Sequence, residues 1–163
     1  MDILWAGWRS EYITSPELQD DDAACLFCHL PELPDAEGLI VERGDRAFTV
    51  LNRYPYTTGH FMVTQYRHLP SPADLDADEQ AEVWRLMTRA MGALDTALGP
   101  HGYNLGANLG RVAGAGVPGH LHLHVVPRWR GDTNFMTAVG ETRVLPEDLE
   151  VTWSRIRAAL GVA

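Results

Sequence analysis

The sequence predicts one α+β domain built on a mainly antiparallel sheet of about five strands. Three short apolar runs separated by turns come first, and a long helical pattern follows. Two further strand patterns and a second helical pattern complete the chain. Strands that follow one another through short turns, interrupted by one helix, favour antiparallel pairing. The 163 residues, of which 45% are hydrophobic and 21% charged, suffice for a single buried core.

The first three predicted strands occupy Leu39–Glu42, Ala47–Leu51 and Phe61–Thr64. A glycine-containing turn at 43–46 separates the first two, and a turn at 54–59 with a proline and a glycine precedes the third. Short apolar runs bounded by such residues are typical of strands joined in hairpins. The first half of the domain is therefore predicted to be sheet.

A helix is predicted at about residues 77–98, because apolar residues recur there at the spacing of one helical face. The residues that carry this pattern are Trp84, Met87, Met91, Leu94 and Leu98. Gly99-Pro100 ends the helix. Two more strands are predicted at Tyr103–Asn108 and His120–Pro127, with the glycine-rich stretch 110–116 between them.

A second helix is predicted near the C-terminus, where Pro146-Glu147-Asp148 provides a typical start. Its apolar positions are Leu149, Trp153, Ile156 and Leu160. We therefore divide the chain into an N-terminal arm at 1–21, one domain at 22–145, and a C-terminal helix at 146–163 that packs on the domain.

Charge and residue usage exclude several classes of function. The chain has 13 basic and 22 acidic residues and a net charge of -9, which argues against binding long nucleic acids or anionic membranes. All the basic residues are Arg, so lysine Schiff bases and lysine phosphate loops are excluded. No apolar run reaches the roughly 18 to 20 residues of a membrane span, and the start of the chain lacks a signal-peptide pattern. We expect a cytoplasmic protein.

Three of the seven histidines, His120, His122 and His124, alternate with aliphatic residues. A strand has a side-chain period of two, so the three imidazoles are expected on one face and the aliphatic side chains in the core. The pattern leaves three interpretations open: a solvent-exposed polar face, a metal cluster, and a nucleophilic site. An imidazole with a pKa near 6.5 is mostly neutral at pH 7 and can attack phosphorus.

The two cysteines, Cys25 and Cys28, form one C-x-x-C motif. It is compatible with a redox pair, half of a zinc site, or two buried small residues. The proline-rich segment 29–34 is a poor helix start, which disfavours the redox interpretation. A closed tetrahedral zinc site would need two more ligands, and histidine is the only other suitable residue type in supply.

His-x-His-x-His followed by two apolar residues resembles the signature of the histidine triad superfamily. The segments that extend this resemblance are 47–55, 58–63, 104–110 and 127–135. Together they cover roughly residues 22–145, and they are most similar to bacterial proteins related to fragile histidine triad hydrolases and diadenosine tetraphosphate phosphorylases. The resemblance implies an α+β domain, a homodimer, and a nucleotide substrate with a phosphoanhydride bond, with dinucleoside polyphosphates favoured.

The resemblance also implies a role for single residues. His122 would attack the α-phosphate to form a nucleotidyl-histidine intermediate, His124 would contact phosphate, and His60 would complete the cluster. Asn52 would contact the ribose and Asn108 the phosphates. For Asn52 a simple turn cap is the alternative, and for His60 a packed core histidine. Nearby arginines, Arg111, Arg128 and Arg130, suit either distal phosphates or surface solubility.

One position departs from the hydrolytic members of the superfamily. Many of them carry Gln followed by Ser or Thr shortly before the triad, where this chain has Gly116 and Val117. Gly116 would leave space for a bulkier acceptor such as inorganic phosphate and would let its backbone N–H approach a phosphate. Hydrolysis, phosphorolysis, phosphoramidate hydrolysis, and nucleotide binding with little turnover therefore all remain open.

Members with this C-x-x-C motif resemble zinc proteins in which two histidines complete the site. In this chain those positions are His68 and His120, with His29 as the rival to His68. A zinc ion held by Cys25, Cys28, His68 and His120 would be structural, and it would divert His120 from the substrate. No organic cofactor is expected.

Overall fold

The structure, a computed structural model, describes residues 25–132 and 147–162. Within them five strands form one sheet in the order β1-β2-β3-β5-β4, and every neighbouring pair is antiparallel. The strands are β1 (Ile40–Arg43), β2 (Ala47–Leu51), β3 (Phe61–Gln65), β4 (Gly102–Gly106) and β5 (His122–Arg128). The predicted α+β class with a five-stranded antiparallel sheet is confirmed.

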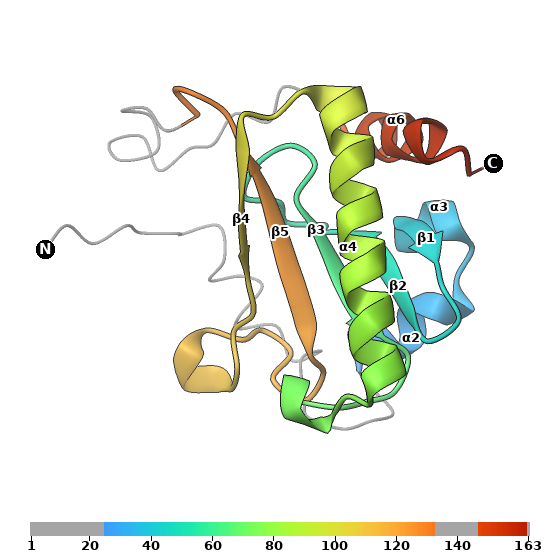
Figure 1. Ribbon diagram of the computed structural model, residues 1–163, viewed down its shortest axis with the longest axis vertical. Coiled ribbons are helices and arrows are strands. Elements are labelled where there is room, and N and C mark those ends of the chain that lie inside the picture. The colour runs from blue at the N-terminus through green and yellow to red at the C-terminus, as the bar shows by residue number, and fades with distance from the viewer. Residues whose placement is uncertain (1–24, 133–146, 163) are drawn as a thin grey trace, which may run out of the picture.

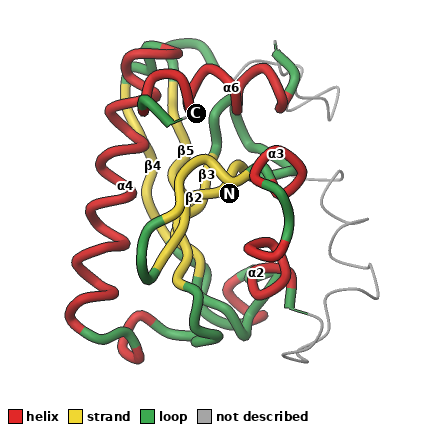
Figure 2. Tube along the Cα trace, turned by 90° about the vertical axis from the view of Figure 1, so that its right-hand side faces the viewer, coloured by secondary structure: helices red, strands yellow, loops and turns green. Residues whose placement is uncertain are grey.

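Two longer and two single-turn α-helices accompany the sheet. They are α2 (Leu26–His29), α3 (Asp35–Gly38), α4 (Ala77–Leu98) and α6 (Leu149–Leu160), and short 3-10 turns lie at Leu30–Glu32, Pro72–Asp74 and Arg111–Ala113. Helix α4 lies across one face of the sheet, while α2 and α3 lie on the opposite side (Figures 1 and 2). The predicted arm at 1–21 and the predicted boundary at 145/146 lie outside the described residues.

Strand bounds agree with the sequence pattern to within one residue, except at the end of β4 and the start of β5, which differ by two. Strand β1 begins at Ile40, one residue later than predicted, because Leu39 takes a left-handed φ of 54° as the C-cap of α3. Strand β4 ends at Gly106, so Asn108 lies beyond it. At both ends the chain leaves the strand pairing, and the pattern of apolar residues does not show where this happens.

Strand β5 begins at His122, not at His120 as predicted. The N–H of Leu121 donates to the carbonyl of Leu69, 2.6 Å away in a loop, whereas His122 is already in register with Thr64 of β3. His120 and Leu121 therefore precede the strand, and the side chain of His120 need not lie on the same sheet face as that of His122.

Helix α4 forms where it is predicted, over Ala77–Leu98. Asp76 and Glu79 build a capping box, each side chain accepting from the other residue's backbone N–H, and Gly99 closes the helix in the left-handed conformation with φ 59°. Its buried apolar side chains are Val83, Leu86, Met87, Ala90, Ala93 and Leu94. Trp84, predicted on this face, is 60% exposed, because the buried stripe is centred on its neighbours one position before and two to three positions after it.

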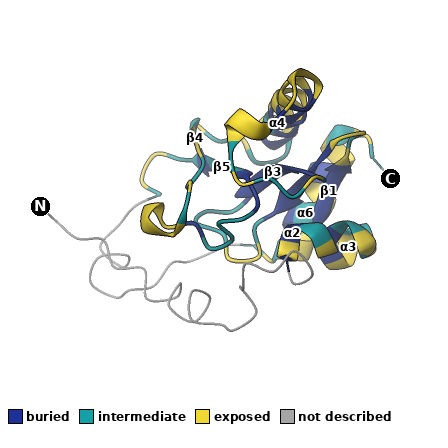
Figure 3. Ribbon diagram, turned by 90° about the horizontal axis from the view of Figure 1, so that it is seen from below, coloured by how far each residue is buried: buried dark blue, intermediate teal, exposed yellow. Residues whose placement is uncertain are grey.

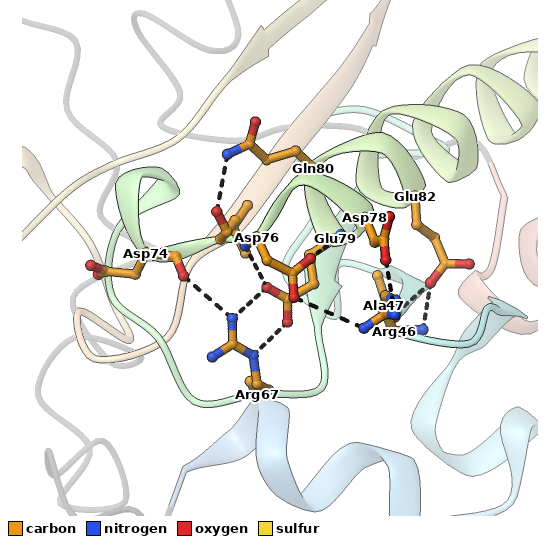
Figure 4. A network of polar contacts seen from close by, with 10 residues as sticks. Arg46, Ala47, Arg67, Asp74, Asp76, Asp78, Glu79, Gln80 and Glu82 are labelled. Carbon is orange, nitrogen blue, oxygen red and sulfur yellow. Dashed lines mark hydrogen bonds and ion pairs between the residues drawn. The ribbon is translucent and has the colours of Figure 1, made fainter.

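Two buried carboxylates near the start of α4 fix the neighbouring loops (Figure 4). Glu79 forms two charge-assisted bonds with Arg67, of 2.6 and 2.5 Å to Nε and Nη2. Glu82 accepts from the backbone N–H groups of residues 45–47 in the β1–β2 turn and from Arg85. Burial by itself would raise the pKa of Glu82, but these donors outweigh it and lower the pKa. The helix start therefore anchors both the hairpin turn and the segment after β3.

Helix α6 confirms the predicted C-terminal helix and packs against α4 and β1. Ile156 is buried in the core, and the indole N–H of Trp153 donates to the carbonyl of Ile40 at 2.8 Å. Arg157 bonds to Asp35 at 2.8 Å and so ties α6 to α3. Figure 3 shows the resulting layers, with β1, β2, β3 and the inner side of α4 mostly buried. None of the described helices combines the length and the hydropathy that a membrane crossing needs.

The two faces of the sheet differ at the β5–β4 end. The hydroxyl of Tyr103 donates to the carbonyl of Met91 in α4 at 3.1 Å, so Tyr103 and its strand-face neighbour Leu105 face α4. His124 pairs in register with Gly106, one position away from Leu105, and therefore faces away from α4. The histidine face is thus on the side of the sheet where α2 lies (Figures 2 and 3).

Candidate functional site

Three predicted catalytic histidines come together at the β3–β5 junction. His122 and His124 alternate along β5, and His60 immediately precedes β3. The ring centroids of His122 and His124 are 5.0 Å apart, and those of His60 and His124 are 5.2 Å apart. His60 and His122 are buried, with 0% and 6% exposure, so water does not determine their hydrogen bonding. The arrangement is a contiguous cluster of three imidazoles.

Hydrogen bonds determine which ring nitrogens of His60 and His124 carry protons. The backbone N–H of Tyr56 donates to Nδ1 of His60 at 3.1 Å, so a neutral His60 carries its proton on Nε2. This Nε2 lies 3.0 Å from Nδ1 of His124, which must then accept. A neutral His124 in turn carries its proton on its own Nε2. The pair therefore presents an N–H donor from His124, which suits a phosphate oxygen.

His122 has the opposite tautomer. Its Nδ1 lies 2.8 Å from the backbone carbonyl of His120, and a carbonyl oxygen can only accept, so Nδ1 carries the proton. Nε2 of the neutral ring then holds a lone pair. Burial is the main cause that lowers the pKa of His122, against a smaller opposing effect of the His120 carbonyl. The ring is thus neutral at pH 7 and has the form that a nucleophile requires.

Two aromatic rings brace the cluster. Phe27 of α2 stacks on His122 with centroids 4.7 Å apart and planes 30° apart. Tyr56 packs on His60 at 4.5 Å. The sequence pattern did not single out either residue. The only sequence feature that could have indicated the Phe27 contact is its position between Cys25 and Cys28. If both cysteines lie beside His120, the residue between them lies close to β5.

His120 turns away from this cluster and joins the cysteines. Its Nδ1 lies 3.4 Å from Sγ of Cys25 and 3.5 Å from Sγ of Cys28, and Nδ1 of His68 lies 3.4 Å from Sγ of Cys28. The four ligand atoms all lie within 4.8 Å of one another. A tetrahedral zinc site has sulfur–nitrogen edges of about 3.5 Å, which the three contacts above match, so this cluster could hold a metal ion.

The surroundings of His120 orient it as a ligand. Its Nε2 lies 2.9 Å from the backbone carbonyl of Gln65, so the ring proton is on Nε2 and the lone pair of Nδ1 faces the cysteines. Burial lowers the pKa of His120 to about 4, which keeps the ring neutral as metal coordination requires. The Gln65 carbonyl is a supporting contact that the sequence pattern did not identify.

The structure decides between the two candidates for the fourth ligand. His68 lies in the cluster, whereas His29 is exposed and bonds to Glu32 at 2.9 Å. Gly119 makes the approach of His68 to the chain possible, because a Cβ at this position would lie 2.9 Å from His68 Nε2. The predicted ligand set of Cys25, Cys28, His68 and His120 is therefore brought together.

The C-x-x-C segment differs from its prediction in one respect. A helix does begin there: α2 is one turn long and follows Cys25 directly, with the N–H groups of Cys28 and His29 both donating to the Cys25 carbonyl. Pro31 occupies an early position of the next 3-10 turn, where its missing N–H costs nothing. The expectation that no helix begins at this motif was therefore wrong. The single turn of α2 places both sulfur atoms beside His120.

The predicted substrate contacts lie at different distances from the histidines. Asn52 is beside His60, with Nδ2 3.4 Å from His60 Nδ1, and its Oδ1 accepts from Tyr54 N–H as the turn-cap alternative expects. Asn108 donates to the carbonyl of Gly114 at 3.2 Å and closes the glycine-rich loop. Gly116 is half-buried in that loop. The structure thus places Asn52 in the cluster and Asn108 in a loop contact.

Arg128 has a structural contact at the other end of β5. It forms a two-pronged ion pair with Asp132, with contacts of 2.6 and 2.8 Å, and donates to Asn104 Oδ1 at 2.7 Å. These bonds tie β5 to β4 and to Asp132 just after β5, so Arg128 has an anchoring role in the fold.

Comparison with known proteins places this geometry in a family. The model of the HIT domain matches residues 34–131, which is more than half of the chain. The chain belongs to the HIT domain family. HIT denotes the histidine triad, so the predicted resemblance is confirmed. A relative from Mycobacterium tuberculosis named AP-4-A phosphorylase is 41% identical over 154 residues, covering 91% of this chain and 79% of the relative.

Solved structures of HIT proteins share the fold. A zinc-bound histidine triad family protein from Mycobacterium smegmatis superposes with a TM-score of 0.69 at 26% identity, covering 86% of this chain and 96% of that protein. A hypothetical histidine triad nucleotide-binding protein from Sulfolobus tokodaii gives 0.68 at 28% identity, covering 84% and 92%. The five-stranded HIT fold described above is therefore shared over most of the chain.

The geometry of the four-ligand cluster generates a metal-binding prediction. We expect His68→Ala to weaken metal affinity by about 100-fold or more, because outer-shell changes alone typically cost 10 to 100-fold. The matched control is His29→Ala, which removes an exposed histidine next to Cys28 and should leave affinity unchanged. Competition with a chromophoric chelator measures both. Metal loss in the His29 variant with retention in the His68 variant would reverse the ligand assignment.

Proposed function

We propose that this HIT protein cleaves dinucleoside polyphosphates of the diadenosine tetraphosphate type at the α-phosphate, through a nucleotidyl-His122 intermediate. The observation that carries the proposal is the hydrogen bond from His122 Nδ1 to the His120 carbonyl, which leaves a lone pair on Nε2. The name of the mycobacterial relative, AP-4-A phosphorylase, supports the substrate class. The predicted roles of His122, His124 and His60 are retained in this proposal.

In the first step, the Nε2 lone pair of His122 attacks the α-phosphorus and a P–N bond forms. The bond from phosphorus to the bridging oxygen breaks, and the electron pair leaves with ATP. The His124 N–H donates to a phosphoryl oxygen and offsets the charge that develops there. His60, held by the Tyr56 N–H, keeps His124 in the donor tautomer. Asn52, beside His60, is positioned for the ribose contact that we retain as part of the proposal.

We propose inorganic phosphate as the acceptor in the second step. A phosphate oxygen attacks the nucleotidyl phosphorus, the P–N pair returns to Nε2, and the product is ADP. The relative's name supports this choice, and so do Gly116 and Val117, which stand where many hydrolytic members carry polar side chains. A glycine leaves space and a backbone N–H for the incoming phosphate. Asn108 closes the same loop, and we retain it in the proposal as a phosphate contact.

We propose zinc as the ion of the four-ligand cluster. Two thiolates and two imidazoles are the donor set that zinc prefers in structural sites, and the bond from His120 to Gln65 supplies the usual outer-shell support. The zinc-bound relative from Mycobacterium smegmatis supports the same choice. Zinc would contribute cross-linking rather than reaction chemistry, since all four positions are taken by protein ligands.

Product analysis tests the proposed reaction. With diadenosine tetraphosphate and inorganic phosphate, we expect equal amounts of ATP and ADP; without phosphate, turnover should stop or fall at least about 100-fold. His122→Ala should lower the turnover rate by a factor of about 10⁴ or more while nucleotide binding is retained. In the control variant His29→Ala, the turnover rate should be unchanged. AMP and ATP formed at full rate in phosphate-free buffer would exclude phosphorolysis. An unchanged rate in His122→Ala would exclude the assigned nucleophile.

We also propose that the protein is a homodimer that pairs through the β4 side of the sheet. Strand β4 is at the end of the sheet order, Leu105 on its α4 side is 46% exposed, and Trp84 of α4 is 60% exposed. A strand edge that has no partner among the described residues, together with large exposed apolar side chains, favours association with a second copy.

Light scattering tests the dimer. We expect a mass of about twice 18.1 kDa, and a shift to the single-chain mass in Leu105→Arg. The control is Val151→Arg, an equally exposed apolar position on α6, which should remain dimeric. A wild-type mass of 18.1 kDa would contradict the proposal.

A further inference from the structure

We propose that the Phe27 ring stabilises the positive charge that the His122 imidazole acquires while it carries the nucleotidyl group. The inference rests on the proposed function and adds a positioning residue to it. Phe27 is 1% exposed, and its ring stacks on His122 with centroids 4.7 Å apart and an interplanar angle of 30°. A cation over an aromatic face within about 6 Å is attracted by the ring quadrupole, more strongly when water is excluded.

The charge follows from the hydrogen-bond geometry. Before the attack His122 is neutral, with its proton on Nδ1 and a lone pair on Nε2. When Nε2 bonds to phosphorus the Nδ1 proton stays in place, so the ring becomes a cation. When the acceptor displaces the nucleotide, the P–N pair returns to Nε2 and the ring is neutral again. The positive charge thus exists only between the two steps.

The surroundings of His122 offer little else to that cation. The ring is 6% exposed, so solvation by water is largely lost. The His120 carbonyl accepts from Nδ1 at 2.8 Å and is one stabilising contact. No Asp or Glu among the described residues bonds to His122 or contributes to its pKa. The stacked face of Phe27 is therefore the main further source of favourable electrostatics in the described surroundings of the ring.

The position of Phe27 is fixed from both sides along the chain. Its neighbours in the C-x-x-C motif, Cys25 and Cys28, place their sulfur atoms 3.4 and 3.5 Å from His120 Nδ1. Phe27 also contacts the His120 ring at a centroid distance of 5.4 Å. The cysteine–histidine cluster consequently holds the aromatic ring against the nucleophile, in addition to pinning α2 to the sheet.

Stepwise fluorination of the Phe27 ring tests the inference, because it weakens the quadrupole with little change in volume. We would place phenylalanines with one, two and three ring fluorines at position 27 and use α-labelled diadenosine tetraphosphate in single-turnover reactions with an alkaline quench. The rate of nucleotidyl-enzyme formation should fall stepwise, by about five- to tenfold over the series. Breakdown of the isolated intermediate by phosphate should not slow, whereas a ring that is merely misplaced would slow both steps.

The same substitutions at Phe48 provide the matched control. Phe48 is fully buried and stacks on Tyr66 at 5.3 Å. It lies two strands from His122 in the sheet and stacks on Tyr66 rather than on a histidine, so its fluorination should leave both rates unchanged. Phe27→Leu should slow formation at least as much as three fluorines do. Equal formation rates across the Phe27 series would overturn the inference and leave the proposed function standing. If wild-type protein formed no nucleotidyl-His122, the proposed function would fail first and the inference with it.

Discussion

The 2.8 Å hydrogen bond between His122 Nδ1 and the His120 carbonyl connects the two halves of this site. Through its backbone, His120 gives His122 the tautomer with a lone pair on Nε2. Through its side chain, the same residue belongs to the cysteine–histidine cluster, with its Nε2 bonded to Gln65. Anything that moves this cluster therefore also moves the carbonyl that orients His122. A metal ion bound there, as we propose, would thus affect the proposed reaction without taking part in it.

The rest of the fold fixes the elements that meet at His120. The antiparallel pairing of β5 with β3 and β4 places His122 and His124 on the face away from α4. The segment after β3, which carries His68, is held by the Arg67–Glu79 ion pair at the start of α4 and by the bond from Leu121 N–H to the Leu69 carbonyl. Several separate parts of the chain therefore determine the positions of a few imidazole nitrogens. The proposed stabilisation of charge at phosphorus needs these nitrogens to be placed that precisely.

Local patterns predicted most of the architecture. Short apolar runs bounded by turns identified β2 and β3 almost to the residue, and helical periodicity with its stop at Gly99 identified α4. The two cysteines were visible as a C-x-x-C motif, whereas His68 and His120 were expected beside them only through the family resemblance. The departures arose where long-range contacts decide. Nothing local indicates that a loop carbonyl releases His120 from the strand, that Trp84 faces solvent, or that Phe27 packs on His122 across 95 positions of sequence. The tautomers of His120 and His124 likewise depend on Gln65 and His60, which are distant along the chain.

The proposed mechanism depends on which ring nitrogens of the histidine cluster carry protons. Nitrogen NMR of imidazole-labelled, metal-loaded protein measures these protonation states. Long-range proton–nitrogen correlations distinguish Nδ1–H from Nε2–H in neutral rings. The structure predicts Nδ1–H for His122 and Nε2–H for both His60 and His124 at pH 7.5. An Nε2–H signal for His122 would contradict the account, because Nε2 would then have no lone pair with which to attack phosphorus, and Nδ1 faces the His120 carbonyl.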